Sequence, residues 1–336
     1  MADQLPVGKL PPDLMRRVLA HAPCDDPRVV VGPGLGLDCA VVDPGGGSLL
    51  VYKSDPITFA AEAIGEYLVR INTNDIATTG AVPRWLLITL LLPERRTTAE
   101  GAEALLEGIY AACREAGIAV LGGHSEVTHG LDRPIAVGTL VGEVDREGLV
   151  QPGGARPGNR ILVTKGVPIE ATAILANEFP ERLRGILSAA ELDEARDYLA
   201  DPGLDVLQDA QTALGAGRVT AMHDPTEGGL VTALWELAEA SGRALEVDLT
   251  LVPVPPLAAR ACEAFGLDPL AAIASGALLL AVEAEDAPTI TAALARAGIP
   301  VADIGEVAEG PWGVGGPDGR TVPQPERDEI GKVYEA

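Results

Sequence analysis

The sequence is poor in aromatic residues, which leaves few rings between which a flat cofactor could be held. Phe, Trp and Tyr together account for 3% of the 336 residues. The hydrophobic cores must therefore be built from Ala, Val, Leu and Ile, and few rings remain on which a nucleobase could stack. We expect no cofactor that is held between aromatic side chains.

Cysteine and long apolar runs are also scarce. The four cysteines are scattered, with no Cys-x-x-Cys pair and no nearby histidine at zinc-ligand spacing, which fits a reducing compartment. No stretch is apolar for long enough to cross a bilayer. The first residues lack the basic and apolar regions of a secretion signal. We therefore expect a cytoplasmic protein without membrane contacts.

Basic residues are outnumbered by acidic ones. The chain has 25 Lys and Arg against 49 Asp and Glu, a formal net charge of −24. This charge repels phosphate backbones and anionic lipids, which argues against nucleic acid as a partner. A nucleotide such as ATP is still allowed where Mg²⁺ bridges its phosphates to carboxylates. Because solubility or adaptation to salt or heat explains the overall charge as well, the functional argument depends on individual aspartates.

The length fits two domains in which strands and helices alternate. Hydrophobic periodicity predicts strands at residues 39–42, 49–52, 85–92, 120–121, 135–141, 160–164, 219–223 and 277–282. It predicts helices at residues 11–21, 60–79, 98–117, 189–199, 229–238 and 289–297. A Pro- and Gly-rich stretch at 151–158 separates the halves, so we place one domain at 1–154 and the other at 155–336. The fold class is α/β or α+β.

Four aspartates stand beside expected turns: Asp38, Asp55, Asp75 and Asp224. Catalytic and binding groups gather at such junctions, because a rigid strand aims the side chain and the loop leaves it accessible. Aspartate also caps helices and closes turns, so each one taken alone has a purely structural explanation. Asp75 lies within an apolar, helix-like segment, where a buried carboxylate needs a partner or a metal.

Glycine-rich turns accompany these acids, at residues 34–36, 122–123 and 228–229. Glycine lets backbone N–H groups approach a phosphate, and a helix N-terminus behind it adds a favourable dipole. Tight turns need glycine regardless of function. The chain lacks both the phosphate-binding loop motif that ends in Gly-Lys-Ser/Thr and the dinucleotide-binding glycine pattern.

Two of the four lysines, Lys53 and Lys165, end expected strands at turns. Both are candidates for phosphate contacts, with a solvated surface position as the alternative. His124 follows two glycines and is a candidate acid–base group or ligand. Ser125 lacks the Gly-x-Ser-x-Gly context of a nucleophile, and no cysteine stands beside a histidine.

Taken together, six segments in order resemble the aminoimidazole ribonucleotide (AIR) synthetase, or PurM-like, superfamily over nearly the whole chain. This superfamily includes selenophosphate synthetase, thiamine monophosphate kinase and the hydrogenase maturation factor HypE, which the chain resembles most. The segments are GLDCAVV (36–42), SD (54–55), NDIA (74–77) with GAVP (80–83), GGHSE (122–126), DPTEGGL (224–230) and IASGALL (273–279).

The resemblance implies an N-terminal sheet domain that pairs with its copy in a homodimer, and a C-terminal α/β domain beside it. ATP would lie between the domains, with Mg²⁺ bridging its phosphates to Asp38, Asp55 and Asp75. The reaction would transfer phosphate to a small-molecule substrate, with catalysis by positioning and charge neutralisation. The expected nucleotide-binding residues are Lys53, Asn74, Gly122, Gly123, Ser125, Glu126 and Thr226. The expected catalytic residues are His124, Lys165 and Asp224.

The chain departs from the family pattern at several positions. Leu37 replaces the first acid of the usual Asp-Asp pair, His124 stands where the family has Asp or Glu, and Glu227 stands where HypE has Arg. HypE carries its carbamoyl group on a C-terminal cysteine, and no cysteine follows Cys262 here. We therefore expect that the chain does not carry out that reaction on its own tail.

Three hypotheses about function follow. The first is an ATP- and Mg²⁺-dependent enzyme that acts on an unidentified small substrate. The second is a hydrogenase maturation factor that works through a partner protein. The third is a non-catalytic nucleotide-binding homologue, for which the missing acid at Leu37 argues.

Overall fold

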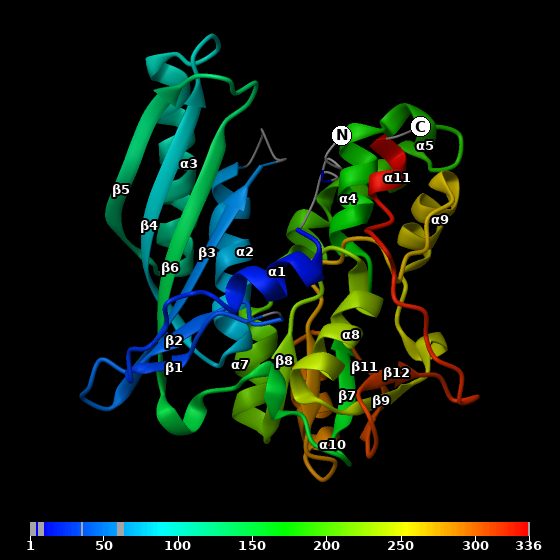
Figure 1. Ribbon diagram of the computed structural model, residues 1–336. Coiled ribbons are helices and arrows are strands. Elements are labelled where there is room, and N and C mark those ends of the chain that lie inside the picture. The colour runs from blue at the N-terminus through cyan, green and yellow to red at the C-terminus, as the bar shows by residue number, and fades with distance from the viewer. Residues whose placement is uncertain (1–4, 6–9, 35, 59–63, 335–336) are drawn as a thin grey trace.

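The computed structural model describes residues 5, 10–34, 36–58 and 64–334. It has two six-stranded sheets, each flanked by helices (Figure 1). Antiparallel pairs dominate both sheets, and each contains one parallel pair: Val82–Pro93 with Ala119–Thr128 in the first, and Ala244–Val247 with Gly313–Gly315 in the second. The fold is therefore the two-domain α+β arrangement that the sequence predicts, and its chain order determines which residues meet.

The first sheet has the strand order β1-β2-β3-β6-β4-β5. Helices α2 and α3 cover one of its faces (Figure 1). Their apolar side chains pack against alternate strand residues, such as Leu49, Leu86 and Leu140, which are fully buried. The elements are α1 (Pro12–Leu19), β1 (Val29–Val31), β2 (Ala40–Val42), β3 (Ser48–Ile57), α2 (Ile64–Thr78), β4 (Val82–Pro93), α3 (Ala99–Ala116), β5 (Ala119–Thr128) and β6 (Ile135–Asp145).

The second sheet has the strand order β12-β9-β11-β7-β10-β8. Its central strands are buried on both faces, with Leu279 and Leu280 both 0% exposed, because helices pack on each side. The strands are β7 (Arg160–Thr164), β8 (Val219–His223), β9 (Ala244–Val247), β10 (Leu279–Val282), β11 (Val301–Ala308) and β12 (Gly313–Gly315). The helices are α4 (Ile169–Glu178), α5 (Pro180–Leu183), α6 (Ala189–Asp197), α7 (Leu207–Ala216), α8 (Gly229–Ser241), α9 (Pro256–Phe265), α10 (Ala287–Arg296) and α11 (Gly331–Tyr334).

Several predicted elements are confirmed. Strands β7 and β8 have the predicted bounds. Helix α3 begins after Thr98, whose hydroxyl accepts a hydrogen bond from the backbone N–H of Gly101, and it ends at Gly117 in the left-handed conformation. The helix predicted at residues 60–79 corresponds to α2, and its first residues, 60–63, lie outside the described parts of the chain.

Several strand predictions were too short, and two of these errors concern candidate site residues. The strand expected at residues 49–52 continues to Ile57, so that Lys53 and Asp55 lie inside β3 and not in a turn. The strand expected at 120–121 continues through the two glycines to Thr128. Both errors come from reading polar or glycine residues as chain breaks, and both change where candidate site residues lie.

The two domains are joined by a short connection and by buried hydrogen bonds. The last strand of the first sheet ends at Asp145, and β7 begins at Arg160. Helix α2 packs against α7 of the second domain. Arg16 of α1 also pairs with Glu239 of α8 across the junction, at 2.6 Å. None of the helices in the described parts of the chain combines the length and apolar character that a membrane span requires.

Candidate functional site

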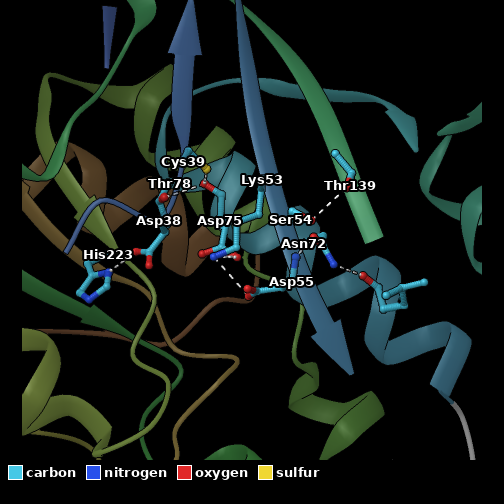
Figure 2. Close-up of polar contacts among 11 residues, drawn as sticks. Asp38, Cys39, Lys53, Ser54, Asp55, Asn72, Asp75, Thr78, Thr139 and His223 are labelled. Carbon is cyan, nitrogen blue, oxygen red and sulfur yellow. Dashed lines mark hydrogen bonds and ion pairs between the residues drawn. The ribbon is translucent and has the colours of Figure 1, made fainter. Parts of the chain in front are cut away.

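Lys53 is the centre of a buried group of charges in the first domain. Its ammonium lies 3.2 Å from a carboxylate oxygen of Asp55 and 3.1 Å from one of Asp75. Lys53 and Asp55 are two residues apart on β3, so both face α2, which supplies Asp75 (Figure 2). The side chains of Lys53 and Asp75 are 10% and 6% exposed, whereas that of Asp55 is 35% exposed.

Burial and mutual attraction shift the ionisation of this group. Burial opposes the charge on Lys53, but the carboxylates of Asp75, Asp38 and Asp55 outweigh it and raise the lysine pKa above its ordinary value. Burial and the charge of Asp224 raise the pKa of Asp75 well above that of a free aspartate. Four acidic side chains therefore surround one ammonium, and this excess of acids favours the binding of a proton or a further cation.

Neighbouring polar groups hold two of these acids in position. The side-chain oxygen of Asn72 accepts a hydrogen bond from the backbone N–H of Asp55 at 3.1 Å, while its amide donates to the carbonyl of Leu68 at 2.8 Å. The thiol of Cys39 donates to the backbone carbonyl of Asp75 at 3.3 Å. These contacts join β3, α2 and the segment after Asp38 into one rigid unit.

The second domain contributes His223 and Asp224, at the end of β8. The imidazole of His223 points toward Asp38, with Nδ1 3.5 Å from a carboxylate oxygen (Figure 2). Its Nε2 lies 2.7 Å from a carboxylate oxygen of Glu236 on α8. Burial opposes a charge on this imidazole, but the hydrogen bond and charge of Glu236, together with Asp38, raise the His223 pKa to about 9.

Asp224 is the most deeply buried acid that faces this junction. The residue is 2% exposed. Burial and the charge of Asp38 raise its pKa to about 7. Its Oδ2 atom is buried and has no hydrogen-bond partner among the described residues. A buried, unsatisfied carboxylate oxygen is costly, which indicates that a cation or a donor from a ligand belongs there.

Two predicted site residues, Asn74 and Lys165, make buried polar contacts within the protein. The amide of Asn74 is fully buried, donates to the carbonyl of Leu204 at 2.7 Å and accepts from the N–H of Val206 at 3.0 Å. Asn74 therefore joins the two domains. Lys165 follows β7 and pairs with Asp209 at 3.2 Å, with both side chains more than 90% buried. The structure does not bring Lys165 to the carboxylates around Lys53.

The segment from Gly122 to Glu126 lies in the edge strand β5, and not in a loop near the aspartates. Strands β6 and β4 separate β5 from β3. A Cβ atom on Gly123 would lie 1.8 Å from the carbonyl oxygen of Ile88, so glycine here allows β5 to approach β4 at an irregularity in the pairing. His124 and Glu126 face the open side of the sheet, where they pair with each other at 3.1 Å.

Backbone conformation and close packing also account for the glycines in the turn after Asp224. Gly228 has a positive φ of 81° at the start of α8, and a Cβ on Gly229 would lie 2.6 Å from the carbonyl oxygen of Leu270. Thr226 is half-buried, and its carbonyl accepts a hydrogen bond from the N–H of Gly229 at 3.0 Å. Thr226 thus lies in the turn between Asp224 and α8, and Glu227 beside it is exposed.

Sequence reasoning missed His223, Glu236 and Asn72. A signal for His223 was available, because a histidine that ends an apolar strand and precedes a buried aspartate is unusual for a core position. Glu236 gave no signal, since its contact with His223 depends on how α8 packs on β8. Asn72 lies two residues before Asn74, outside the matched NDIA segment, so the resemblance did not point to it.

The donor set fits a divalent cation. Asp38, Asp55, Asp75 and Asp224 offer carboxylate oxygens, the ligands that Mg²⁺ prefers. Their combined charge exceeds that of Lys53, and Asp224 has an oxygen without a hydrogen-bond partner in the described chain. The arrangement can therefore hold Mg²⁺ together with an anionic group at the meeting point of the domains.

Comparison with known proteins identifies the family. The AIR synthase related protein models match residues 36–144 for the N-terminal domain and 156–315 for the C-terminal domain. Carbamoyl dehydratase HypE of Cupriavidus necator is 31% identical over 287 residues, which cover 82% of this chain and 77% of that protein. The chain belongs to the AIR synthase-related family.

Other members of this family extend the comparison. Selenide, water dikinase of Nitratidesulfovibrio vulgaris is 30% identical over 351 residues, covering 89% of this chain and 92% of that protein. A crystal structure of hydrogenase maturation protein HypE in complex with ATP superimposes with a TM-score of 0.70 at 27% identity, covering 91% of this chain and 92% of that one. The similarity to HypE and the two-domain fold are thus confirmed.

Proposed function

We propose that this AIR synthase-related protein is an enzyme that uses Mg-ATP to phosphorylate or otherwise activate a small substrate where its two domains meet. The observation that supports it is the convergence of Asp38, Asp55 and Asp75 on Lys53, beside the buried Asp224. An acidic group of this kind can bind a polyphosphate only through divalent cations. A relative with ATP bound supports the choice of nucleotide.

In this proposal Asp38, Asp55 and Asp75 hold Mg²⁺, which when bound neutralises the charge of the transferring phosphate group. The charge of Lys53 opposes the burial that raises the pKa of Asp55 and Asp75, and its ammonium holds both carboxyl groups in place. Asn72 fixes the backbone of Asp55 and so limits the movement of its carboxylate. Asp224 faces the same group from the second domain and is suited to bind a cation or a substrate donor.

The missing acid at position 37 does not remove the site. Leu37 packs against the apolar core of the first domain, so its side chain contributes to folding there. The acids at 38, 55 and 75 still meet around Lys53. This favours a catalytic protein over the alternative of a non-catalytic nucleotide-binding homologue.

A role in hydrogenase maturation through a partner protein is the second candidate. The 31% identity to carbamoyl dehydratase HypE favours it. Incubating the purified chain with a carbamoyl donor and measuring covalent transfer of the carbamoyl group to a side chain distinguishes it from a small-molecule enzyme. Transfer to this chain would support the maturation role, whereas ATP turnover driven by a free small molecule would support the first proposal.

Thermal unfolding tests nucleotide binding. ATP with Mg²⁺ should raise the melting temperature of the wild type, and ATP in excess EDTA should not. Asp55→Asn should lose the effect, whereas the control Asp193→Asn, on the exposed face of α6, should keep it. Equal effects with and without Mg²⁺ would contradict the proposed role of the carboxylates.

We also propose that the chain forms a homodimer through the open face of the first sheet. Helices α2 and α3 cover the opposite face, and Leu87 on the open side is 42% exposed. An apolar sheet face of this kind is usually covered by another surface. Within one chain two strands separate the Gly122–Glu126 segment from Asp55, and in a dimer the segment would approach the phosphates bound by the second copy.

A further inference from the structure

His223 is held in an orientation that metal-binding histidines commonly have. Its Nε2 lies 2.7 Å from a carboxylate oxygen of Glu236, so Nε2–H is the donor of that hydrogen bond. The other ring nitrogen, Nδ1, faces Asp38 at 3.5 Å (Figure 2). Metal-ligating histidines almost always donate their second N–H to a carboxylate or carbonyl, which fixes the ring and its tautomer. A metal ion would replace the Nδ1 proton, and the neutral imidazole would then present the Nδ1 lone pair to the junction between the domains.

Asp224 supplies an independent sign of a missing ligand. It follows His223 directly, is 2% exposed, and has a buried carboxylate oxygen with no hydrogen-bond partner in the described chain. One donor atom from each of Asp38, His223 and Asp224 lies within 4.8 Å of the other two. Two ligands bound to one ion at about 2.1 Å in tetrahedral geometry lie roughly 3.4 Å apart, close to the separation of His223 from Asp38.

We propose that Asp38, His223 and Asp224 form a centre for a divalent transition metal ion such as Zn²⁺, with Glu236 orienting the imidazole. Imidazole is a good ligand for Zn²⁺, Co²⁺ and similar ions, whereas Mg²⁺ prefers oxygen ligands alone. Three protein ligands leave at least one coordination position open, the arrangement of catalytic and not of structural zinc sites. A water molecule or a substrate oxygen fits that position.

The centre lies across the domain junction. Asp38 belongs to the first domain, and His223 and Asp224 belong to the second, so that a bound ion would join them. It shares Asp38 with the proposed Mg-ATP site but requires neither nucleotide nor the acids at positions 55 and 75. The two proposals can therefore fail separately.

Titration of the nucleotide-free, full-length chain with Co²⁺ in excess Mg²⁺ tests the centre, with the visible absorption bands of Co²⁺ as the readout. The wild type should bind one Co²⁺ per chain, and Zn²⁺ should displace it. His223→Gln should weaken binding by about 100-fold or more and abolish the bands. Glu236→Gln, which keeps all three ligands, should weaken binding by about 10- to 100-fold.

The control is His129→Gln, which removes an exposed imidazole paired with Glu94 at 2.7 Å, outside the centre. It should bind Co²⁺ like the wild type, as should Asp55→Asn, which affects only the proposed Mg-ATP site. Circular dichroism verifies that each variant is folded. If His223→Gln does not fold, the Co²⁺ affinity of Glu236→Gln is the deciding measurement. Absence of Co²⁺ binding by the folded wild type, displacement by Mg²⁺, or wild-type affinity in the decisive variant would overturn the proposal.

Discussion

Replacing Lys53 with methionine tests how the buried charges are balanced. Methionine has a similar length and no charge, so Lys53→Met removes the ammonium without opening a large cavity. Asp75, whose side chain is 6% exposed, then loses its cation, and Asp55 loses the same partner. We expect the folded protein to be strongly destabilised near neutral pH.

The magnitude follows from burial. Breaking a buried ion pair by removing one partner costs about 3–5 kcal/mol, because the remaining charge stays buried without compensation. The side chain of Asp55 is 35% exposed, so water screens part of its charge. The expected loss is therefore near the lower end, about 3 kcal/mol of unfolding free energy. Mg²⁺ should recover part of it, since the carboxylates then have a cation again.

Urea denaturation followed by circular dichroism measures this loss, with and without Mg²⁺. The matched control is Lys332→Met, which removes a lysine that is 47% exposed and pairs with Glu329 at the surface. The control should lose less than about 1 kcal/mol. A loss for Lys53→Met no larger than that of the control would refute the argument that Lys53 holds the carboxylates together.

Three other substitutions test separate parts of the account. Burial raises the pKa of Glu170 to about 7, so the folded state holds a proton that the unfolded state releases at lower pH. The free energy of unfolding should therefore fall by about 3 kcal/mol as the pH rises from about 4.5 through 7. Glu170→Gln should remove that loss in urea denaturation at several pH values, and an unchanged pH profile would contradict it. Asn74→Ala should lower the unfolding free energy by about 2–4 kcal/mol because it leaves two buried backbone groups between the domains unpaired; a loss below about 0.5 kcal/mol would be inconsistent with this. Leu87→Glu should convert the dimer to monomer in light scattering, whereas Leu251→Glu, exposed in the second domain, should not.

The sequence predicted the elements whose local signals agree with their surroundings. Strands β7 and β8 are short apolar runs bounded by turns, and α3 has both a threonine N-cap and a glycine C-cap. These features are local, so one sequence is enough to recognise them. Motif order also predicted that the aspartates at 38, 55 and 75 belong to one site, and the structure places all three around Lys53.

Where prediction failed, tertiary contacts override the local signal. Lys53 and Asp55 continue β3 because Asp75 and Asn72 on α2 satisfy them on the buried face. Gly123 continues β5 because a strand that approaches its neighbour closely needs glycine. Glu236 is far from Asp38 in sequence and joins the site only through His223. None of these contacts follows from periodicity.

The most direct test of the Mg-ATP assignment is calorimetric titration of ATP into the purified chain, with Mg²⁺ and with EDTA, for the wild type and Asp75→Asn. Asp75 is buried beside Lys53, and its substitution by asparagine replaces one carboxylate oxygen with an amide nitrogen. We expect Mg²⁺-dependent binding of ATP by the wild type and no binding by Asp75→Asn, although that variant remains folded. No binding by the wild type, or equal binding by both proteins, would contradict it.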